Sequence, residues 1–215
     1  ILRWLTDAGY TCITNKELAD FQINGTPLPA KKCYLIGFDD IPTYIWADLR
    51  LRRIFKRYNS KPYFALELGF YVDSSMSSNV YNIPNSVIQY KDNDSHRLML
   101  QKRVKVMQEE GWEVVIHGAK EGYVHRGVTY SQMKSWLEDA FNVATQLGFI
   151  SDYWCIAANQ FTPNQIKMHE FMGIKTSSST QGAYCGLAHH PNYTPRVGYE
   201  ASGDNGTEQR WTYIL

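Results

Sequence analysis

The sequence lacks the long apolar run that a membrane-spanning helix needs, since no stretch of about 18 apolar residues occurs in the chain. It also lacks a strong charge of either sign: the formal net charge of the 215 residues is +1 at pH 7. That balance favours neither nucleic acid nor a membrane surface as a partner. A GxGxxG loop, a GxSxG motif and a CxxC pair are all missing, so dinucleotide binding, serine hydrolysis and paired-cysteine sites have no support.

Cysteine is scarce as well, and its spacing is wide. The four cysteines are Cys12, Cys33, Cys155 and Cys185. A disulfide framework needs closer and more regular spacing, so free thiols are expected. The chain starts with Ile1 inside an amphipathic segment, and we expect residues 1–215 to be a single domain taken from a longer protein.

Apolar strand-like runs alternate with amphipathic stretches along the chain. The expected strands are 33–38, 63–71, 113–116, 153–157 and 195–199. The expected helices are 2–5 (the end of one), 15–21 after the cap Thr14, 46–58, 95–111, 130–147 before Gly148, and 165–172. Loops are expected over 73–85 and 177–194, the latter with room for short strands, and a turn over 202–207. This order predicts an α/β fold whose parallel sheet is a barrel or a doubly wound sheet with helices outside.

Two sets of polar residues on the expected helices should face solvent. Residues 50–57, RLRRIFKR, are the one basic cluster, and apolar residues are interleaved within it. That pattern indicates the solvated face of an amphipathic helix rather than a nucleic-acid patch. His96 and His169 are likewise expected to be exposed.

Two adjacent acidic residues, Asp39 and Asp40, follow the apolar run 33–38. Like charges side by side repel, and each carboxylate loses hydration beside a buried strand. A chain tolerates such a pair best where a metal ion, a solvated turn or a reaction uses it. An exposed turn at the strand end is the alternative, because Asp is common in turns.

His117 follows the apolar run 113–116, at the strand edge where ligands bind in parallel α/β folds. A carboxylate with an imidazole suits zinc or a similar divalent ion, so Asp40 and His117 are predicted metal ligands. A third ligand is needed, and Glu121 and His125 follow His117 closely enough to supply it. Alternatively, His117 is only a polar residue at a strand end.

Several stretches, in order along most of the chain, resemble the polysaccharide deacetylases, also called the NodB-homology domain or carbohydrate esterase family four. The family's strand of the type TFDDG is similar to YLIGFDD here, and its GhEigsHt stretch is similar to GWEVVIHG. The stretches that carry the resemblance are 9–18, 28–29, 34–40, 54–65, 109–118 and 195–197.

The resemblance implies a distorted, open (β/α) barrel, incomplete in this chain, that removes acetyl groups from an N-acetylated polysaccharide. It implies that Asp39 is the general base and that Asp40 and His117 bind a divalent metal, expected to be zinc. A glycan partner places the protein outside the cell, at a cell surface or on a virion.

The chain departs from the family pattern at four places, one of which is Ile41, where the family has a Gly after the Asp pair. Glu121 stands where the second metal-binding His belongs, so either Glu121 or His125 is the expected third ligand. After the strand 153–157 the family's orienting Arg is missing, and Asn159 and Gln160 are the expected substrate-binding residues there. The family's last motif, a strand ending in a His, does not appear before Leu215, so that His either lies beyond the end of this chain or is absent. These departures leave activity open, and the alternative is a degenerate module that binds glycan or builds a surface or phage tail assembly with other subunits.

Overall fold

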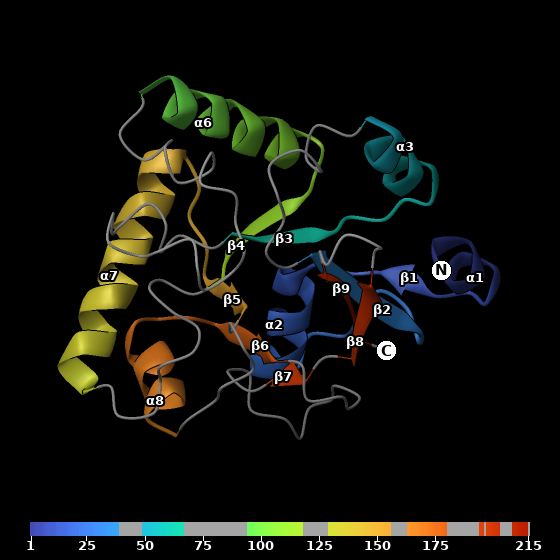
Figure 1. Ribbon diagram of the computed structural model, residues 1–215. Helices are drawn as coiled ribbons and strands as arrows, with labels where there is room; N and C mark the ends of the chain where they lie inside the picture. The colour runs from blue at the N-terminus through green and yellow to red at the C-terminus, as the bar shows by residue number, and fades with distance from the viewer. Residues whose placement is uncertain are drawn as a thin grey trace.

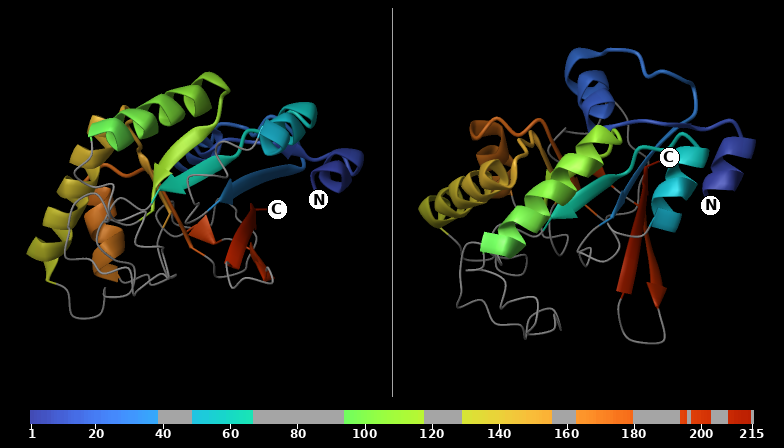
Figure 2. Two further views of the ribbon diagram at one scale, coloured as in Figure 1. Left: turned by 45° about the horizontal axis from the view of Figure 1, so that its top comes forward. Right: turned by 90° about the horizontal axis from the view of Figure 1, so that it is seen from above.

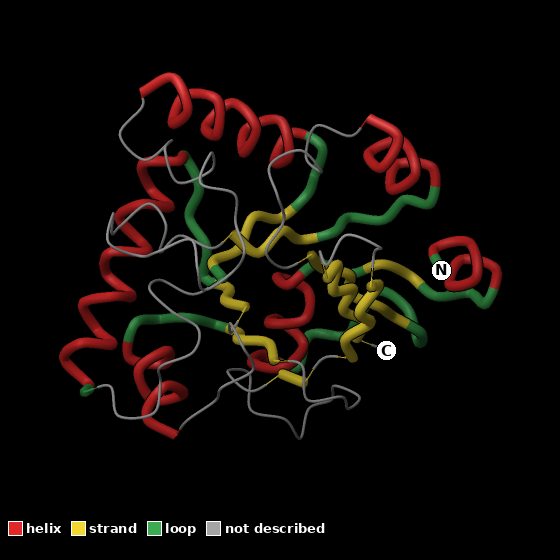
Figure 3. Tube along the Cα trace, in the orientation of Figure 1, coloured by secondary structure: helices red, strands yellow, loops and turns green. Residues whose placement is uncertain are grey.

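A computed structural model describes residues 1–38, 49–66, 94–117, 129–155, 163–179, 194–195, 197–202 and 208–214 (Figure 1). Helices and strands alternate along most of this length, as Figure 3 shows by colour. The helices are α1 (Leu2–Asp7), α2 (Asn15–Asn24), α3 (Leu49–Arg57), α6 (Asp94–Glu109), α7 (Tyr130–Leu147) and α8 (Pro163–Phe171). The strands are β1 (Thr11–Cys12), β2 (Cys33–Phe38), β3 (Tyr63–Leu66), β4 (Glu113–Ile116), β5 (Tyr153–Cys155), β6 (Thr176–Ser179), β7 (Thr194–Pro195), β8 (Val197–Ser202) and β9 (Glu208–Ile214).

The described strands form one sheet in the order β7-β6-β5-β4-β3-β2-β9-β8, with β1 also paired to β2. Each pair from β2 to β7 is parallel, and these strands follow their order in the sequence. A doubly wound sheet reverses its strand order once, which these strands do not do. Right-handed crossovers that all run in one direction place every connecting helix on the same face of the sheet. The helices between these strands, α3, α6, α7 and α8, therefore share one side, the outer side. The predicted α/β class is confirmed.

The sheet has a hydrophobic core on each face. On β2, Tyr34 and Ile36 belong to the outer core, whereas Leu35 belongs to the inner one, as the alternation of a strand requires. The outer core takes in buried side chains from α1, α3, α6, α7 and α8. The inner core contains Leu18 of α2, so α2 covers the opposite face. In Figure 1, α2 lies at the centre of the view with α3, α6, α7 and α8 around the periphery.

β2 pairs on its two edges with strands from distant parts of the sequence. β1 pairs with its beginning, through Thr11 opposite Cys33, on the edge that β3 occupies further along. β9 pairs antiparallel with the other edge, from Leu35 opposite Ile214 onward, and β8 and β9 form an antiparallel hairpin there. We expected no strand at β1 or β9. The sequence of 208–214 nevertheless indicates a strand, because its aromatic and β-branched residues follow a Gly/Asp/Asn turn.

Several element bounds differ from the predicted ones. α2 continues to Asn24 rather than stopping at Phe21, and it ends where Gly25 adopts a left-handed conformation with φ of 68°. The segment 177–179, expected to be loop-like, belongs to β6. The predicted strand 195–199 is divided between β7 and β8. The predicted loop 73–85 lies outside the described residues, as does the predicted turn 202–207 except for Ser202, which ends β8.

Three of the cysteines, Cys12, Cys33 and Cys155, are free thiols, as predicted, while Cys185 lies outside the described residues. Cys12 packs against the outer core and Cys33 against the inner one, so the two thiols point to opposite faces of the sheet. No helix among the described residues is both long and apolar enough to cross a membrane.

A buried polar cluster joins β1, β2 and the turn before β3. The hydroxyl groups of Tyr34 and Ser60 are hydrogen-bonded, and the Cys12 thiol accepts a hydrogen bond from the amide of Lys61 at 3.3 Å. Burial raises the pKa of the Cys12 thiol to about 11 and that of the Tyr34 phenol to about 12. Both groups therefore hold their protons more tightly in the folded state than in the unfolded chain.

We expect this cluster to make the fold sensitive to alkaline pH. The ordinary pKa values are 9.0 for Cys12 and 10.0 for Tyr34, so both folded-state values are raised. The stabilisation is complete below those ordinary values and is lost as the pH rises through the folded-state values. Denaturant unfolding between pH 8 and pH 11 should show the free energy of unfolding falling. Tyr34→Phe should flatten the fall at its alkaline end, whereas Tyr130→Phe, at an exposed position, should not.

Candidate functional site

The carboxyl ends of the parallel strands meet along one edge of the sheet. Phe38 at the end of β2 lies opposite Phe64, and Leu66 at the end of β3 lies opposite Ile116 at the end of β4. Ile116 in turn pairs with Trp154 of β5. Residues that directly follow these strands in the sequence are therefore brought to a common edge. This is the edge where parallel α/β folds place their active sites.

His117 is the predicted site residue that the structure describes, and it lies at this edge. Its amide donates a hydrogen bond to the carbonyl of Leu66 at 2.8 Å, which continues the pairing of β4 with β3. The side chain is buried, with 3% of its surface exposed. Its Nδ1 lies 2.9 Å from the carbonyl oxygen of Cys155, at the end of the neighbouring strand β5.

The contact with Cys155 fixes the tautomer of His117. A carbonyl oxygen can only accept a hydrogen bond, so Nδ1 carries the hydrogen, and the neutral ring has its lone pair on Nε2. A backbone carbonyl that orients Nδ1–H is the usual second partner of a metal-binding histidine, whose Nε2 then binds the ion. The ring therefore fits a divalent metal. A histidine that merely ended a strand in solvent would not need this burial.

The other predicted site residues lie outside the described part of the chain. They are Asp39, Asp40, Glu121, His125, Asn159 and Gln160. Within the described ranges, no three His, Cys, Asp or Glu side chains gather to hold a metal ion. The metal set predicted from the sequence, His117 included, thus stays a prediction. Asp39 follows β2 directly in the sequence, and β2 ends at the same edge as β4.

His169 is not exposed as predicted, because α8 turns it toward the sheet. Only 1% of its surface is exposed, and its ring lies 5.3 Å from the ring of Trp154, centroid to centroid. The sequence held a signal for this, since Met168, His169 and Met172 share one face of a helix. His169 packs with the outer helices, whereas His117 lies at a strand end.

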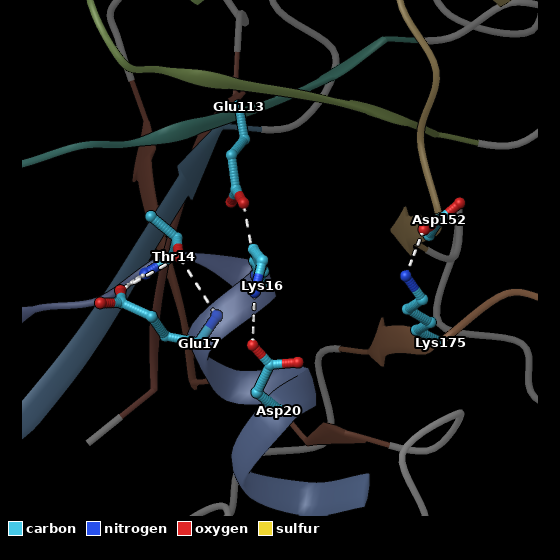
Figure 4. A network of polar contacts seen from close by, with 7 residues as sticks. All are labelled: Thr14, Lys16, Glu17, Asp20, Glu113, Asp152 and Lys175. Carbon is cyan, nitrogen blue, oxygen red and sulfur yellow. Dashed lines mark hydrogen bonds and ion pairs between the residues drawn. The ribbon is translucent and has the colours of Figure 1, made fainter. Parts of the chain in front are cut away.

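The opposite end of β4 carries a second polar residue, partly buried, with a different role. Glu113 accepts hydrogen bonds from the amide of Asn15 at 2.7 Å and from the side-chain Nδ2 of the same residue at 2.9 Å. It also accepts one from the amide of Lys16 at 3.3 Å, which Figure 4 shows. Thr14 and Glu17 complete the start of α2 with a reciprocal capping box. Burial raises the pKa of Glu113, and the amide donors oppose that rise.

The two ends of β4 are therefore built for different purposes. Glu113 holds α2 against the inner face, and two ion pairs stand nearby, Lys16 with Asp20 and Lys175 with Asp152, both at 2.6 Å (Figure 4). Such contacts at the amino ends of parallel strands serve stability. The carboxyl end, with His117, is left as the candidate site.

Comparison with known proteins identifies the fold. No protein-family model matches the chain, and no curated protein matches it in sequence. Solved structures do match. The deacetylase PplD of Streptococcus pyogenes, solved in complex with acetate, gives a TM-score of 0.68 at 16% identity, over 90% of this chain and 76% of that one.

Two further deacetylase-type structures agree. The BpsB deacetylase domain from Bordetella bronchiseptica gives a TM-score of 0.65 at 12% identity, over 90% of this chain and 80% of that one. IcaB from Ammonifex degensii gives 0.64 at 15% identity, over 91% and 79%. The chain thus has the fold of the polysaccharide deacetylases, as its sequence motifs predicted. At these identities the likeness concerns the fold.

Proposed function

We propose that this chain is a metal-dependent deacetylase domain that hydrolyses N-acetyl groups on a polysaccharide. The observation that carries the proposal is the state of His117: buried at the carboxyl end of β4, with Nδ1–H directed at the carbonyl of Cys155. A histidine oriented in this way presents Nε2 as a ligand. The fold shared with structures named as deacetylases supports the same reaction class.

The proposed roles follow the order of the residues along the strand ends. His117 and Asp40 would hold a divalent ion, zinc by ligand type, with Glu121 or His125 as the third ligand. When bound, such an ion polarises the acetamide carbonyl and lowers the pKa of water. The carboxylate of Asp39 would accept the proton of the attacking water, because a neighbouring cation keeps that carboxylate ionised.

Substrate contacts and location form the rest of the proposal. Asn159 and Gln160 follow β5 closely in the sequence, and their amide groups could donate hydrogen bonds to sugar hydroxyls or to the acetamide. An N-acetylated glycan of a cell wall or surface would be met outside the cell, at the cell surface or on a virion.

A second function is favoured by a specific feature of the sequence. Glu121 replaces the second metal-binding His of the family pattern, and the family's orienting Arg is missing after β5. Each loss removes an interaction of the kind that lowers a transition-state barrier by several kcal/mol. The alternative is a catalytically degenerate module that binds glycan or serves as a structural part of a surface or phage tail assembly.

Measuring the metal bound by the purified protein distinguishes the metal-dependent deacetylase from the degenerate module. After dialysis against zinc and then buffer, we expect about one ion per chain in the parent protein, since a single three-ligand site is proposed. His117→Ala should lower metal affinity at least about 100-fold, because removing a ligand costs more than removing its supporting hydrogen bond. Deacetylation of N-acetylglucosamine oligomers should fall with it.

The matched control is Glu113→Gln, at the other end of the same strand. It should lower stability and leave the metal content of the folded protein unchanged. A parent protein with no bound ion would overturn the metal-dependent reaction. One ion per chain without release of acetate from any N-acetylated oligomer would favour the glycan-binding module instead.

A further inference from the structure

The chain concentrates positive charge on one short helix, although its net charge is only +1. α3 has the sequence LRLRRIFKR, with five basic residues and no acidic one. Its inward side is anchored by Phe55, which is buried in the outer core. Arg52 is also occupied, since its guanidinium forms a two-pronged ion pair with the carboxylate of Glu110, directly after α6. One side of α3 is therefore held against the rest of the protein, by the burial of Phe55 and by the ion pair of Arg52.

The other side of α3 carries exposed basic residues without ion partners. Arg53, Lys56 and Arg57 are exposed, and among the described residues none of the three forms an ion pair. Their spacing of three and four positions puts them on one helical face. Arg50 is exposed one turn before Arg53. Exposed guanidinium groups attract phosphate groups, which Arg binds with paired hydrogen bonds.

Apolar side chains flank this basic face. Leu49 is 57% exposed and Ile54 is 46% exposed, although each sits among basic residues. The neighbouring helix α1 adds Trp4, 62% exposed, and Figure 2 shows α1 beside α3 in both views. The phosphate backbone of a nucleic acid offers no apolar region that Leu49 and Ile54 could enter. A bilayer does, because basic side chains meet its headgroups while the apolar ones enter the acyl boundary.

We propose that the exposed face of α3, formed by Leu49, Arg53, Ile54, Lys56 and Arg57, docks the protein on a membrane containing anionic phospholipid. This role is independent of the reaction proposed at the strand ends. The charge of this one face, rather than the net charge of the chain, determines the attraction to a membrane. Salt screens electrostatic attraction beyond about 10 Å, and only one face of the protein lies that close to the bilayer.

Vesicle sedimentation tests this. The parent chain should bind vesicles of phosphatidylcholine containing roughly one-third phosphatidylglycerol, and it should dissociate at high salt. Removing three charges with Arg53→Gln, Lys56→Gln and Arg57→Gln should lower the partition coefficient on the order of 100-fold. Leu49→Ser with Ile54→Ser should lower it roughly tenfold without changing the charge.

The matched control removes three exposed lysines elsewhere, with Lys102→Gln, Lys105→Gln and Lys167→Gln. It has the same net charge as the α3 variant and should bind like the parent. The proposal is overturned if the parent does not sediment with the anionic vesicles, if both triple variants lose binding equally, or if pure phosphatidylcholine binds as well. Binding to a DNA duplex that the Leu49/Ile54 variant retains, without vesicle binding, would also overturn it.

Discussion

Gly37→Ala is expected to destabilise the fold by about 3 kcal/mol or more, at the upper end of overpacking effects. Gly37 faces the ring of Tyr63 across the β2–β3 pair, and a Cβ on Gly37 would lie 1.9 Å from Cζ of that ring. Tyr63 is 1% exposed and packed in the inner core, so its ring cannot swing into solvent. Denaturant unfolding of the parent and the variant measures the difference.

A double mutant establishes the cause. Tyr63→Leu shortens the side chain and removes the ring atoms that a Cβ would meet. On that background Gly37→Ala should cost less than about 1 kcal/mol, which gives a large coupling energy. Gly25→Ala is the control for losing a glycine in open space: nothing lies near its Cβ, so only its positive φ is penalised, by about 1 kcal/mol. Equal costs at Gly37 in both backgrounds would contradict the steric explanation.

Glu113→Ala should be nearly as damaging, with a loss of about 2–5 kcal/mol in the free energy of unfolding. The substitution leaves the amides of Asn15 and Lys16 without their acceptor at the start of α2. Buried donors without a partner carry most of that penalty. α2 should then loosen from the inner face, so its amides should exchange with deuterium faster than those of α7.

Two other variants show whether the acceptor matters. Glu113→Gln retains one oxygen but sets an NH₂ group against the amide donors, so an intermediate loss is expected. Asp152→Ala removes a partly exposed carboxylate paired with Lys175 and should cost less than about 1 kcal/mol. If Glu113→Ala matched Asp152→Ala, Glu113 would not hold the start of α2.

The parts of the fold that sequence alone predicted are those with local signals. The run 33–38 is apolar on both faces because β2 is buried on both faces, and this made the strand plain. Thr14 marked the start of α2 as its cap, a local signal that the structure confirms and completes with Glu17 in a capping box. Gly148 marked the end of α7, where it adopts φ of 89°.

The rest depended on contacts between distant segments. β1 is two residues long and exists because Thr11 and Cys12 pair with β2. The position of His117 at a strand end was predictable, and the structure confirms it. The carbonyl that fixes its tautomer comes from Cys155 on another strand, which no local pattern indicates. The metal-binding role of His117 stays a prediction, as do the roles of Asp39, Asp40, Glu121, His125, Asn159 and Gln160.

The pairing of β2 also constrains how the chain is made. β1 and β3 both pair with the same edge of β2, opposite Cys33–Tyr34 and Gly37–Phe38, and both precede β9 in the sequence. The other edge, from Leu35 to Phe38, must wait for β9, which the ribosome delivers after all the other described strands. Until then β2 presents unpaired backbone amides and carbonyls to other chains, which is a template for aggregation. Recovery of soluble protein during synthesis should therefore depend on chaperones that shield an open strand edge, because this long-range pairing forms last.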